Sequence, residues 1–306
     1  MRIFIAGQEG MVGSAIYKLF KRKNYFIIDC KRQDLDLTDQ SKTRLWFKKK
    51  RPDVVINAAG KVGGILDNSL HQADYIYRNT IIGFNLIRCS LESNKVKKFI
   101  NLGSACIYPK TTKQPIKEEY LLSSYLEETN EGYAIAKIAT LKYCEYIKKF
   151  YKKDFISLQP ANLYGTGDNF DLKSSHVIPA LIRKFHFAKI HNKYSVEVWG
   201  SGSAKREFLH ADDLASAVLF CLKKKISQSY LNIGGADYLS IKKLAEIIKD
   251  VTKYKGKIFF NKKYPDGVKA RKLDVTRIQH MGWKHTIPLK KGLLDYYSYF
   301  KKLNIS

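Results

Sequence analysis

The chain has 306 residues, 45% of them hydrophobic, and a formal net charge of +27. This composition can bury the core of one large domain, or of one domain with a smaller second one, and excludes an intrinsically disordered chain. The N-terminus enters an expected strand without an export signal, and no apolar run reaches the roughly 18 residues of a membrane-spanning helix, so no membrane partner is expected.

The basic residues are dispersed along the chain. The densest runs, 48–51 and 223–225, fall at expected helix ends, where cations complement the helix dipole. No basic segment interleaved with aromatics appears, so we expect a solvated surface that attracts an anionic substrate and has no nucleic-acid partner. The five cysteines form no Cys-x-x-Cys pair and the seven histidines lack ligand spacing, which favours a reduced, cytoplasmic protein without a metal site.

The chain begins with an expected strand over residues 2–6. Gly7-Gln-Glu-Gly10-Met-Val-Gly13 follows and leads into a helix over 14–23. Strand, glycine turn and helix in this order are the context of a dinucleotide site, because the glycines let the backbone approach a pyrophosphate at the helix N-terminus. The spacing is G-x-x-G-x-x-G rather than G-x-G-x-x-G.

A second strand is expected over 25–29, and the residues at its end bear on the cofactor. Asp29 favours a free ribose 2′-hydroxyl, whereas Lys31 and Arg32 favour a 2′-phosphate, so NADH and NADPH both stay open. Asp36 is placed either near the adenine edge or in a turn.

Strands and helices then alternate. Strands are expected over 53–56, 98–102 and 155–159, and helices over 40–50, 70–93 and 131–153, with a flexible loop at 61–64. This alternation predicts an α/β fold, a doubly wound parallel sheet of the Rossmann type. Ligands of such sheets bind at the carboxyl ends of the strands, where Gly7, Ala58, Ser104 and Asn162 fall.

Beyond residue 165 the pattern loosens. Helices are expected over 177–190, 212–224, 240–254 and 289–303, with short strands near 196–199, 230–233 and 257–260. We expect a dinucleotide-binding domain over 1–165 and a smaller mixed α/β substrate lobe over 166–306, partly interleaved with the first.

The stretch from 98 to 137 carries the chemistry. Ser104 follows a strand end, and Tyr133 and Lys137 are four residues apart, so they share one helix face. A phenol supplies a proton to a carbonyl oxygen, a nearby lysine charge lowers the phenol pKa, and a serine hydroxyl holds the same oxygen. Tyr-x-x-x-Lys also occurs by chance, but the serine and the glycine turn favour carbonyl reduction.

With these residues assembled, the chain resembles the extended short-chain dehydrogenase/reductases that act on nucleotide sugars, and within them the GDP-L-fucose synthase family. The resemblance is carried by segments 59–65, 104–110, 133–137, 162–165, 168–170, 175–181, 198–202, 206–210 and 273–277. It implies a homodimer that uses NADP(H) to reduce C4 of a GDP-4-keto-6-deoxy-sugar, with epimerisation at C3 and C5, for surface-glycan synthesis.

The resemblance also implies roles for residues. Ser104, Tyr133 and Lys137 form the reduction triad, while Cys106 and His176 are the acid and base of epimerisation. A C4 ketone acidifies the protons on C3 and C5, and both side chains are tunable near neutrality. The structural alternatives are a small buried cysteine and a histidine that merely begins a helix.

The same resemblance assigns binding residues. The cofactor set comprises Gly7, Gly10, Met11, Val12, Gly13, Arg32, Asp36, Leu37, Ala58, Leu102, Gly103, Tyr133, Lys137, Pro160, Asn162, Leu163 and His176. The substrate set comprises Ser104, Asn162, Lys184, Trp199, Arg206 and Asp274. In it, Arg206 and Lys184 meet the diphosphate, and Trp199 packs either on the guanine or on the core.

Several positions depart from the family pattern. Glu9 stands where a basic residue commonly holds the 2′-phosphate, Gly132 replaces a proline, Ala161 replaces a threonine, and the basic cluster at 269–271 is shifted. One alternative is a reductase without epimerase activity that acts on a GDP-4-keto-6-deoxy-heptose. A non-catalytic dinucleotide-sensing or nucleic-acid-binding protein is the alternative of another class, and Cys106 speaks against a dehydratase or a 4-epimerase.

Overall fold

The computed structural model describes residues 1–264, 266–303 and 305. Its centre is a six-stranded, all-parallel sheet with the strand order β2-β1-β3-β4-β5-β9. The strands are β1 (Arg2–Ala6), β2 (Phe26–Ile28), β3 (Val54–Asn57), β4 (Lys98–Leu102), β5 (Asp154–Pro160) and β9 (Tyr230–Ile233). The predicted doubly wound parallel sheet is therefore confirmed.

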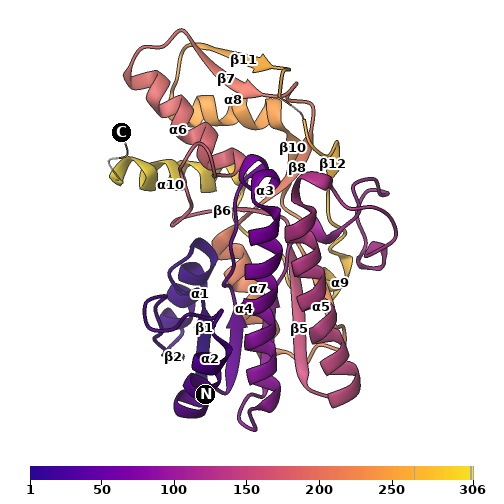
Figure 1. The fold of residues 1–306 in the computed structure, drawn as a ribbon. Helices are drawn as coiled ribbons and strands as arrows, with labels where there is room; N and C mark the ends of the chain where they lie inside the picture. Colours follow the sequence, from indigo (N-terminus) through magenta and orange to yellow (C-terminus); the bar gives the residue numbers. More distant parts are fainter. Residues whose placement is uncertain (265, 304, 306) are drawn as a thin grey trace.

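Helices cover both faces of this sheet (Figure 1). Helices α1 (Met11–Arg22) and α7 (Ala211–Lys223) share one apolar cluster with the sheet, and α2 (Gln40–Lys50), α4 (Gln72–Glu92) and α5 (Glu131–Tyr151) supply the other. Strands β3 and β4 are buried along their whole length, which explains why most of their residues are apolar.

A smaller lobe with its own core lies beyond the carboxyl ends of the strands (Figure 1). It contains α6 (Val177–Ile190), α8 (Ile241–Thr252), α10 (Leu289–Lys302), and the parallel pair β7 (Ser195–Trp199) and β11 (Lys257–Asn261). A second small sheet is centred on β8 (Lys205–His210), which pairs with β6 (Asn162–Tyr164), β10 (Asp237–Ser240) and β12 (Ala270–Arg271).

The structure adds elements that the sequence did not predict. The strands β6, β8, β10 and β12 are short or mix charged and apolar residues, and each is stabilised by a partner distant in the chain. The short helices α3 (Ile65–Leu70) and α9 (Thr276–His280) were also missed. The interleaving of the two parts runs through β9 and α7, which belong to the main sheet layer; the boundary at residue 165 stays a prediction.

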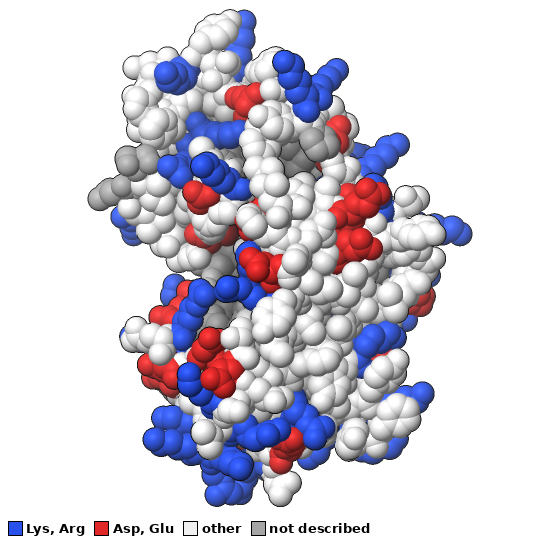
Figure 2. Space-filling model, in the orientation of Figure 1, with Lys and Arg blue, Asp and Glu red and all other residues white. Residues whose placement is uncertain are grey.

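The molecular surface carries its basic residues in a dispersed manner. Figure 2 shows Lys and Arg side chains over upper and lower parts of the visible face, densest at the lower end, with acidic side chains between them. Among the described residues, no helix is both long and apolar enough to cross a membrane.

A row of buried amides crosses the sheet beneath the strand ends. Asn57 Nδ2 donates to Asn101 Oδ1 at 2.9 Å, and Asn101 Nδ2 donates to Ser157 Oγ at 2.8 Å. Gln159 Nε2 donates to the same hydroxyl at 3.1 Å, and its Oε1 accepts the backbone N–H of Ser104 at 3.0 Å. The row therefore joins three strands and ends on the serine of the predicted site.

Removing the middle of this row should be costly. We expect Asn101→Ala to lower the free energy of unfolding by about 2–4 kcal/mol, because it leaves the Asn57 amide without its buried acceptor and removes one of the two donors to the Ser157 hydroxyl. Urea unfolding measures the loss, and the exposed Asn94→Ala serves as the control, with an expected change below about 0.5 kcal/mol. Equal effects of the two variants would contradict a structural role for the row.

Candidate active site

The predicted site residues gather at the carboxyl ends of the parallel strands. Gly7 follows β1, the N–H of Ala58 donates to the Ala6 carbonyl oxygen at 3.0 Å, and the N–H of Gly103 donates to Leu158 at 2.8 Å. These contacts extend the ladder just past the strand ends, so the turns after β1, β3, β4 and β5 lie at the same edge of the sheet, where ligands of such folds bind.

Three of the predicted catalytic side chains meet at the end of β4. Lys137 Nζ donates to the Leu102 carbonyl oxygen at 3.0 Å and lies 5.6 Å from the centre of the Tyr133 ring. The Tyr133 phenol is hydrogen-bonded to the Ser104 side chain. A carbonyl oxygen beside these two hydroxyls would accept a proton from one and a hydrogen bond from the other.

The electrostatics of this group differ from the expectation in one respect. We expected the lysine charge to lower the phenol pKa, but burial raises the pKa of Tyr133, the nearby Cys106 raises it further, and only the Ser104 hydrogen bond opposes them. Burial also lowers the pKa of Lys137 to about 8. Desolvation outweighs the charge because both side chains are nearly closed to water.

Cys106 lies in a single 3-10 turn directly after the serine. Its N–H donates to Ser104 Oγ at 3.1 Å, and its sulfur accepts a hydrogen bond from Asn130 Nδ2 at 3.5 Å. The side chain is half-buried, whereas the other four cysteines are buried. Asn130 was missed by the sequence reasoning, although its position three residues before Tyr133 was a usable signal.

His176 belongs to another element of the fold. It is the N-cap residue of α6, its side chain makes no capping hydrogen bond, and it is exposed. Surrounding protein nevertheless desolvates the ring and lowers its pKa, so the imidazole is uncharged at neutral pH and able to accept a proton.

The glycine turn forms a cradle for a diphosphate. Gly7 has a φ of +80°, and a Cβ there would lie 2.8 Å from the backbone nitrogen of Ala59. A Cβ on Gly13 would overlap the Gly7 carbonyl group. Gly10 caps α1, whose first turn holds no acidic side chain, so its free N–H groups suit an anion. These features fit a dinucleotide.

The residues at the end of β2 frame the expected ribose site. Glu9 accepts the backbone N–H of Arg32 at 2.9 Å, which leaves the Arg32 guanidinium exposed and without an ion-pair partner in the described chain. Asp36 binds the N–H and hydroxyl of Thr38, so its carboxylate is occupied in a turn.

The other predicted cofactor residues follow from the same architecture. Met11 and Val12 open α1, Leu37 lies in the loop before α2, Pro160 ends β5, and Leu163 lies in β6. Asn162 directs its side-chain amide to the Glu207 carbonyl oxygen at 3.0 Å, which fixes β6 against β8. Their contact with a cofactor stays a prediction.

Two arginines form a cationic pair beside the cysteine. Arg206 in β8 and Arg271 in β12 are neighbours in register, and Arg271 donates to the carbonyl oxygen of Ala105. Arg271 is only 6% exposed, and desolvation together with its charge lowers the pKa of Arg206. Neither has a salt bridge within the described residues, so the pair suits an anionic ligand. The sequence indicated Arg206 but not Arg271.

The remaining predicted substrate residues fall in two places. Lys184 Nζ lies 4.9 Å from the centre of the Trp199 ring, and Trp199 stacks on Tyr264 with ring centres 4.3 Å apart. Trp199 is 40% exposed, which favours the ligand-facing interpretation over a core role. The Asp274 carboxylate instead accepts the N–H of Thr276, the first residue of α9, at 2.9 Å.

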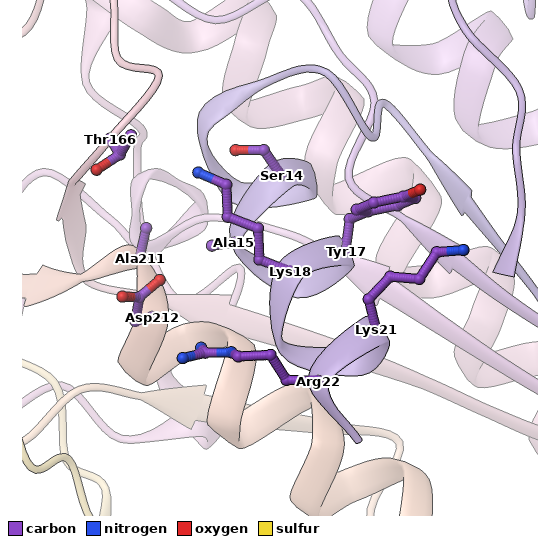
Figure 3. A pocket seen from close by; sticks show the side chains of 9 residues that line it. All are labelled: Ser14, Ala15, Tyr17, Lys18, Lys21, Arg22, Thr166, Ala211 and Asp212. Atoms are coloured by element: carbon purple, nitrogen blue, oxygen red, sulfur yellow. The ribbon is translucent and has the colours of Figure 1, made fainter. Parts of the chain in front are cut away.

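A separate hollow of about 460 Å³ lies between α1 and α7 (Figure 3). Lys18 and Arg22 extend toward Asp212 and Thr166, while Tyr17 and Lys21 point to the other side (Figure 3). None of the predicted site residues lines it, and its basic side chains are exposed. We therefore assign the chemistry to the crevice at the strand ends.

Comparison with known proteins places this geometry in context. Residues 3–234 match the model of the NAD dependent epimerase/dehydratase family. A GDP-L-fucose synthase of Sinorhizobium fredii is 46% identical over 98% of this chain and 95% of its own. Two solved structures are each 35% identical: a GDP-mannoheptose C4 reductase from Campylobacter jejuni with NADP bound (TM-score 0.89, 98% of both chains) and a GDP-6-OMe-4-keto-L-xylo-heptose reductase from C. jejuni (TM-score 0.93, 99% and 98%).

The contact between Asn130 and Cys106 is testable through thiol reactivity. We expect iodoacetamide to label Cys106 first, since the other four cysteines are buried. Asn130→Ala should slow this labelling at pH 7 about fivefold, because the attacking thiolate loses a hydrogen-bond donor.

Mass spectrometry of the alkylated protein measures the rate. Thr129→Ala is the matched control, because this neighbour bonds Glu127 and does not touch the sulfur. An unchanged rate in Asn130→Ala would show that the amide does not influence the thiol.

Proposed function

The chain belongs to the NAD dependent epimerase/dehydratase family and to its GDP-L-fucose synthase branch, and we propose that it reduces C4 of a GDP-4-keto-6-deoxy-sugar with NADPH after epimerising C3 and C5. The observation that carries this proposal is the convergence of Ser104, Cys106, Tyr133 and Lys137 on one strand end. The names of the similar proteins support the same substrate class.

Reduction of the ketone uses the hydroxyl groups of Ser104 and Tyr133. The ketone oxygen lies between Ser104 and Tyr133, and the phenol proton passes to that oxygen as the C4–O bond becomes an alcohol. Lys137 keeps a positive charge near the phenol while anchored on Leu102, which stabilises the developing phenolate. When bound, the nicotinamide supplies the hydride to C4.

Epimerisation uses the side chains of Cys106 and His176. The ketone makes the C3 and C5 hydrogens acidic, because the electron pair left behind is delocalised onto the C4 oxygen. One of His176 and Cys106 removes the proton, and the other returns a proton to the opposite face. The uncharged imidazole suits the base, and the amide of Asn130 stabilises the sulfur when it bears the negative charge.

Charge complementarity supports the nucleotide part of the substrate. Arg206 and Arg271 offer two guanidinium groups that form no salt bridge within the described chain, which suits a diphosphate. Lys184 in α6 and Trp199 in β7 lie together in the smaller lobe and suit a nucleoside.

NADPH is the cofactor that the structure favours. The free guanidinium of Arg32 lies at the end of β2, where a ribose 2′-phosphate is expected, and the similar C. jejuni reductase carries NADP. Glu9 is occupied by the Arg32 backbone and does not cover that guanidinium.

A second candidate substrate is a heptose. Two C. jejuni structures that resemble this chain at 35% identity act, by their names, on GDP-heptoses. Both Cys106 and His176 are present, which favours the bifunctional enzyme over the reductase-only alternative. Product NMR after turnover of GDP-4-keto-6-deoxy-hexoses and GDP-4-keto-6-deoxy-heptoses separates the two substrates. A role in surface-glycan synthesis and a cytoplasmic location stay predictions.

Tyr133→Phe should separate the two halves of the reaction. We expect NADPH oxidation with GDP-4-keto-6-deoxy-D-mannose to fall about 10²–10⁴-fold, because the proton donor is lost. Deuterium uptake at C3 and C5 in D₂O without cofactor should fall far less, since the acid and base remain.

Tyr125→Phe is the matched control, because Tyr125 is 91% exposed. Absence of both NADPH oxidation and deuterium uptake in the unmodified enzyme, with the whole panel of GDP-4-keto-sugars, would refute the proposed function. Deuterium uptake without NADPH oxidation would refute the reductase activity and leave the epimerase activity standing.

We also propose a homodimer through α4 and α5. These two helices pack against each other and expose an apolar stripe that includes Tyr77 (64% exposed) and Phe84 on α4 with Ile135 and Tyr146 on α5. A contiguous exposed stripe of this kind on a helix pair is typical of a subunit interface.

Tyr146→Glu should convert the dimer to a monomer, because it places a charge within the exposed apolar stripe. Light scattering coupled to size-exclusion chromatography measures the mass. Tyr194→Glu is the control, since this exposed tyrosine directly precedes β7 of the smaller lobe. A monomeric unmodified protein at micromolar concentration would contradict the proposal.

A further inference from the structure

The glycine pair Gly63–Gly64 lies against the residues that precede His176. The N–H of Gly64 donates to the Ser174 carbonyl oxygen at 2.8 Å. A Cβ on Gly64 would overlap the Ser175 carbonyl oxygen and lie 3.2 Å from its carbon. With φ −70° and ψ 179°, Gly64 has a conformation open to any residue. Glycine is therefore required here by the proximity of the neighbouring backbone.

Contacts from Asn68 and Tyr75 fix the position of the glycine pair. Asn68 Nδ2 donates to the carbonyl oxygens of Gly63 and Gly64 at 2.7 and 3.0 Å. A Cβ on Gly63 would overlap the Tyr75 hydroxyl, which donates to the Asp67 carboxylate. Tyr75 is fully buried in α4, so a long helix packed on the central sheet determines where the glycine pair lies.

His176 depends on this backbone contact for its place. Its ring has no hydrogen-bond partner among the described residues, and although His176 is the N-cap residue of α6, its side chain makes no capping hydrogen bond. The turn before it is closed on itself, because Asp171 accepts the N–H and hydroxyl of Ser174 and the N–H of Ser175. Because no described residue forms a hydrogen bond with the imidazole, its position follows from where residues 174 and 175 are held.

The same helix also contacts the reduction half of the site. The Tyr75 ring packs edge-on against the Tyr133 ring, with centres 6.1 Å apart and planes at 83°. Tyr75 thus touches the reduction acid on one side and limits the glycine pair on the other. The reduction group is additionally fixed by Ser104 and Lys137, whereas His176 has the glycine pair and its own helix.

We propose that Gly63–Gly64 is a positioning element for His176, which sets the geometry of proton exchange at the sugar and not that of hydride transfer. This rests on the proposed function. It gives the 59–65 segment, which carried the family resemblance but no chemical group, a defined physical role. The close approach of two backbones, rather than chain flexibility, is what the glycines provide.

Gly64→Ala tests the proposal by pushing Ser175 away. We expect deuterium uptake from D₂O at the carbon served by His176 to fall about 100-fold, because a displacement of about 1 Å has that effect on a reacting group. The NADPH oxidation rate should stay nearly unchanged, and NMR should show a product reduced at C4 without inversion at that carbon.

Asn68→Ala provides a second variant without steric overlap. It removes both bonds that hold the glycine carbonyl groups, so uptake should fall about fivefold with oxidation again preserved. Gly256→Ala is the matched control for crowding alone, because a Cβ there would overlap Tyr254 in the smaller lobe. It should lower the melting temperature and leave the ratio of uptake to oxidation unchanged.

The outcomes separate the two proposals. If the unmodified enzyme shows neither uptake nor oxidation, the proposed function fails. If it shows both and the Gly64 and Asn68 variants keep full uptake, the positioning role is wrong. A parallel loss of uptake and oxidation in both variants would also overturn it, since the glycine pair would then be only a general structural element.

Discussion

One hydrogen bond organises the candidate site. The Lys137 ammonium, almost closed to water, donates to the Leu102 carbonyl oxygen and so ties α5 to the end of β4. Tyr133 lies one helical turn away on the same face, and Ser104 lies two residues beyond Leu102, so this contact brings phenol and hydroxyl together. Burial of the cation without a carboxylate is unfavourable, and the lowered pKa of Lys137, about 8, reflects it.

The two halves of the site have different supports. The reduction group is joined to the central sheet, because the row of buried amides ends on Ser104. His176 begins α6 of the smaller lobe, and the two residues before it contact Gly64. Under the proposed function, reduction and epimerisation therefore depend on separate contacts, and we expect substitutions that touch no reacting group to change their rates separately.

The alternation of apolar strands and amphipathic helices was enough to predict the central sheet, and most of its strands begin and end within one or two residues of the expected positions. The small sheet around β8 was missed, because its strands are short and paired across long stretches of chain. With it, the pairing of Arg271 with Arg206 was missed. The expected lowering of the Tyr133 pKa was wrong, because a sequence shows the charge of Lys137 but not the burial of both groups.

The sequence by itself determined the kinds of chemical group and their local spacing. Tyr133 and Lys137 share a face because helix geometry fixes residues four apart, and Ser104 follows a strand end because the apolar run stops at Leu102. Only the tertiary structure decided that Asn130 touches Cys106 and that Gly64 touches Ser175. Contacts between residues distant in the chain depend on how layers pack, and no local pattern encodes that packing.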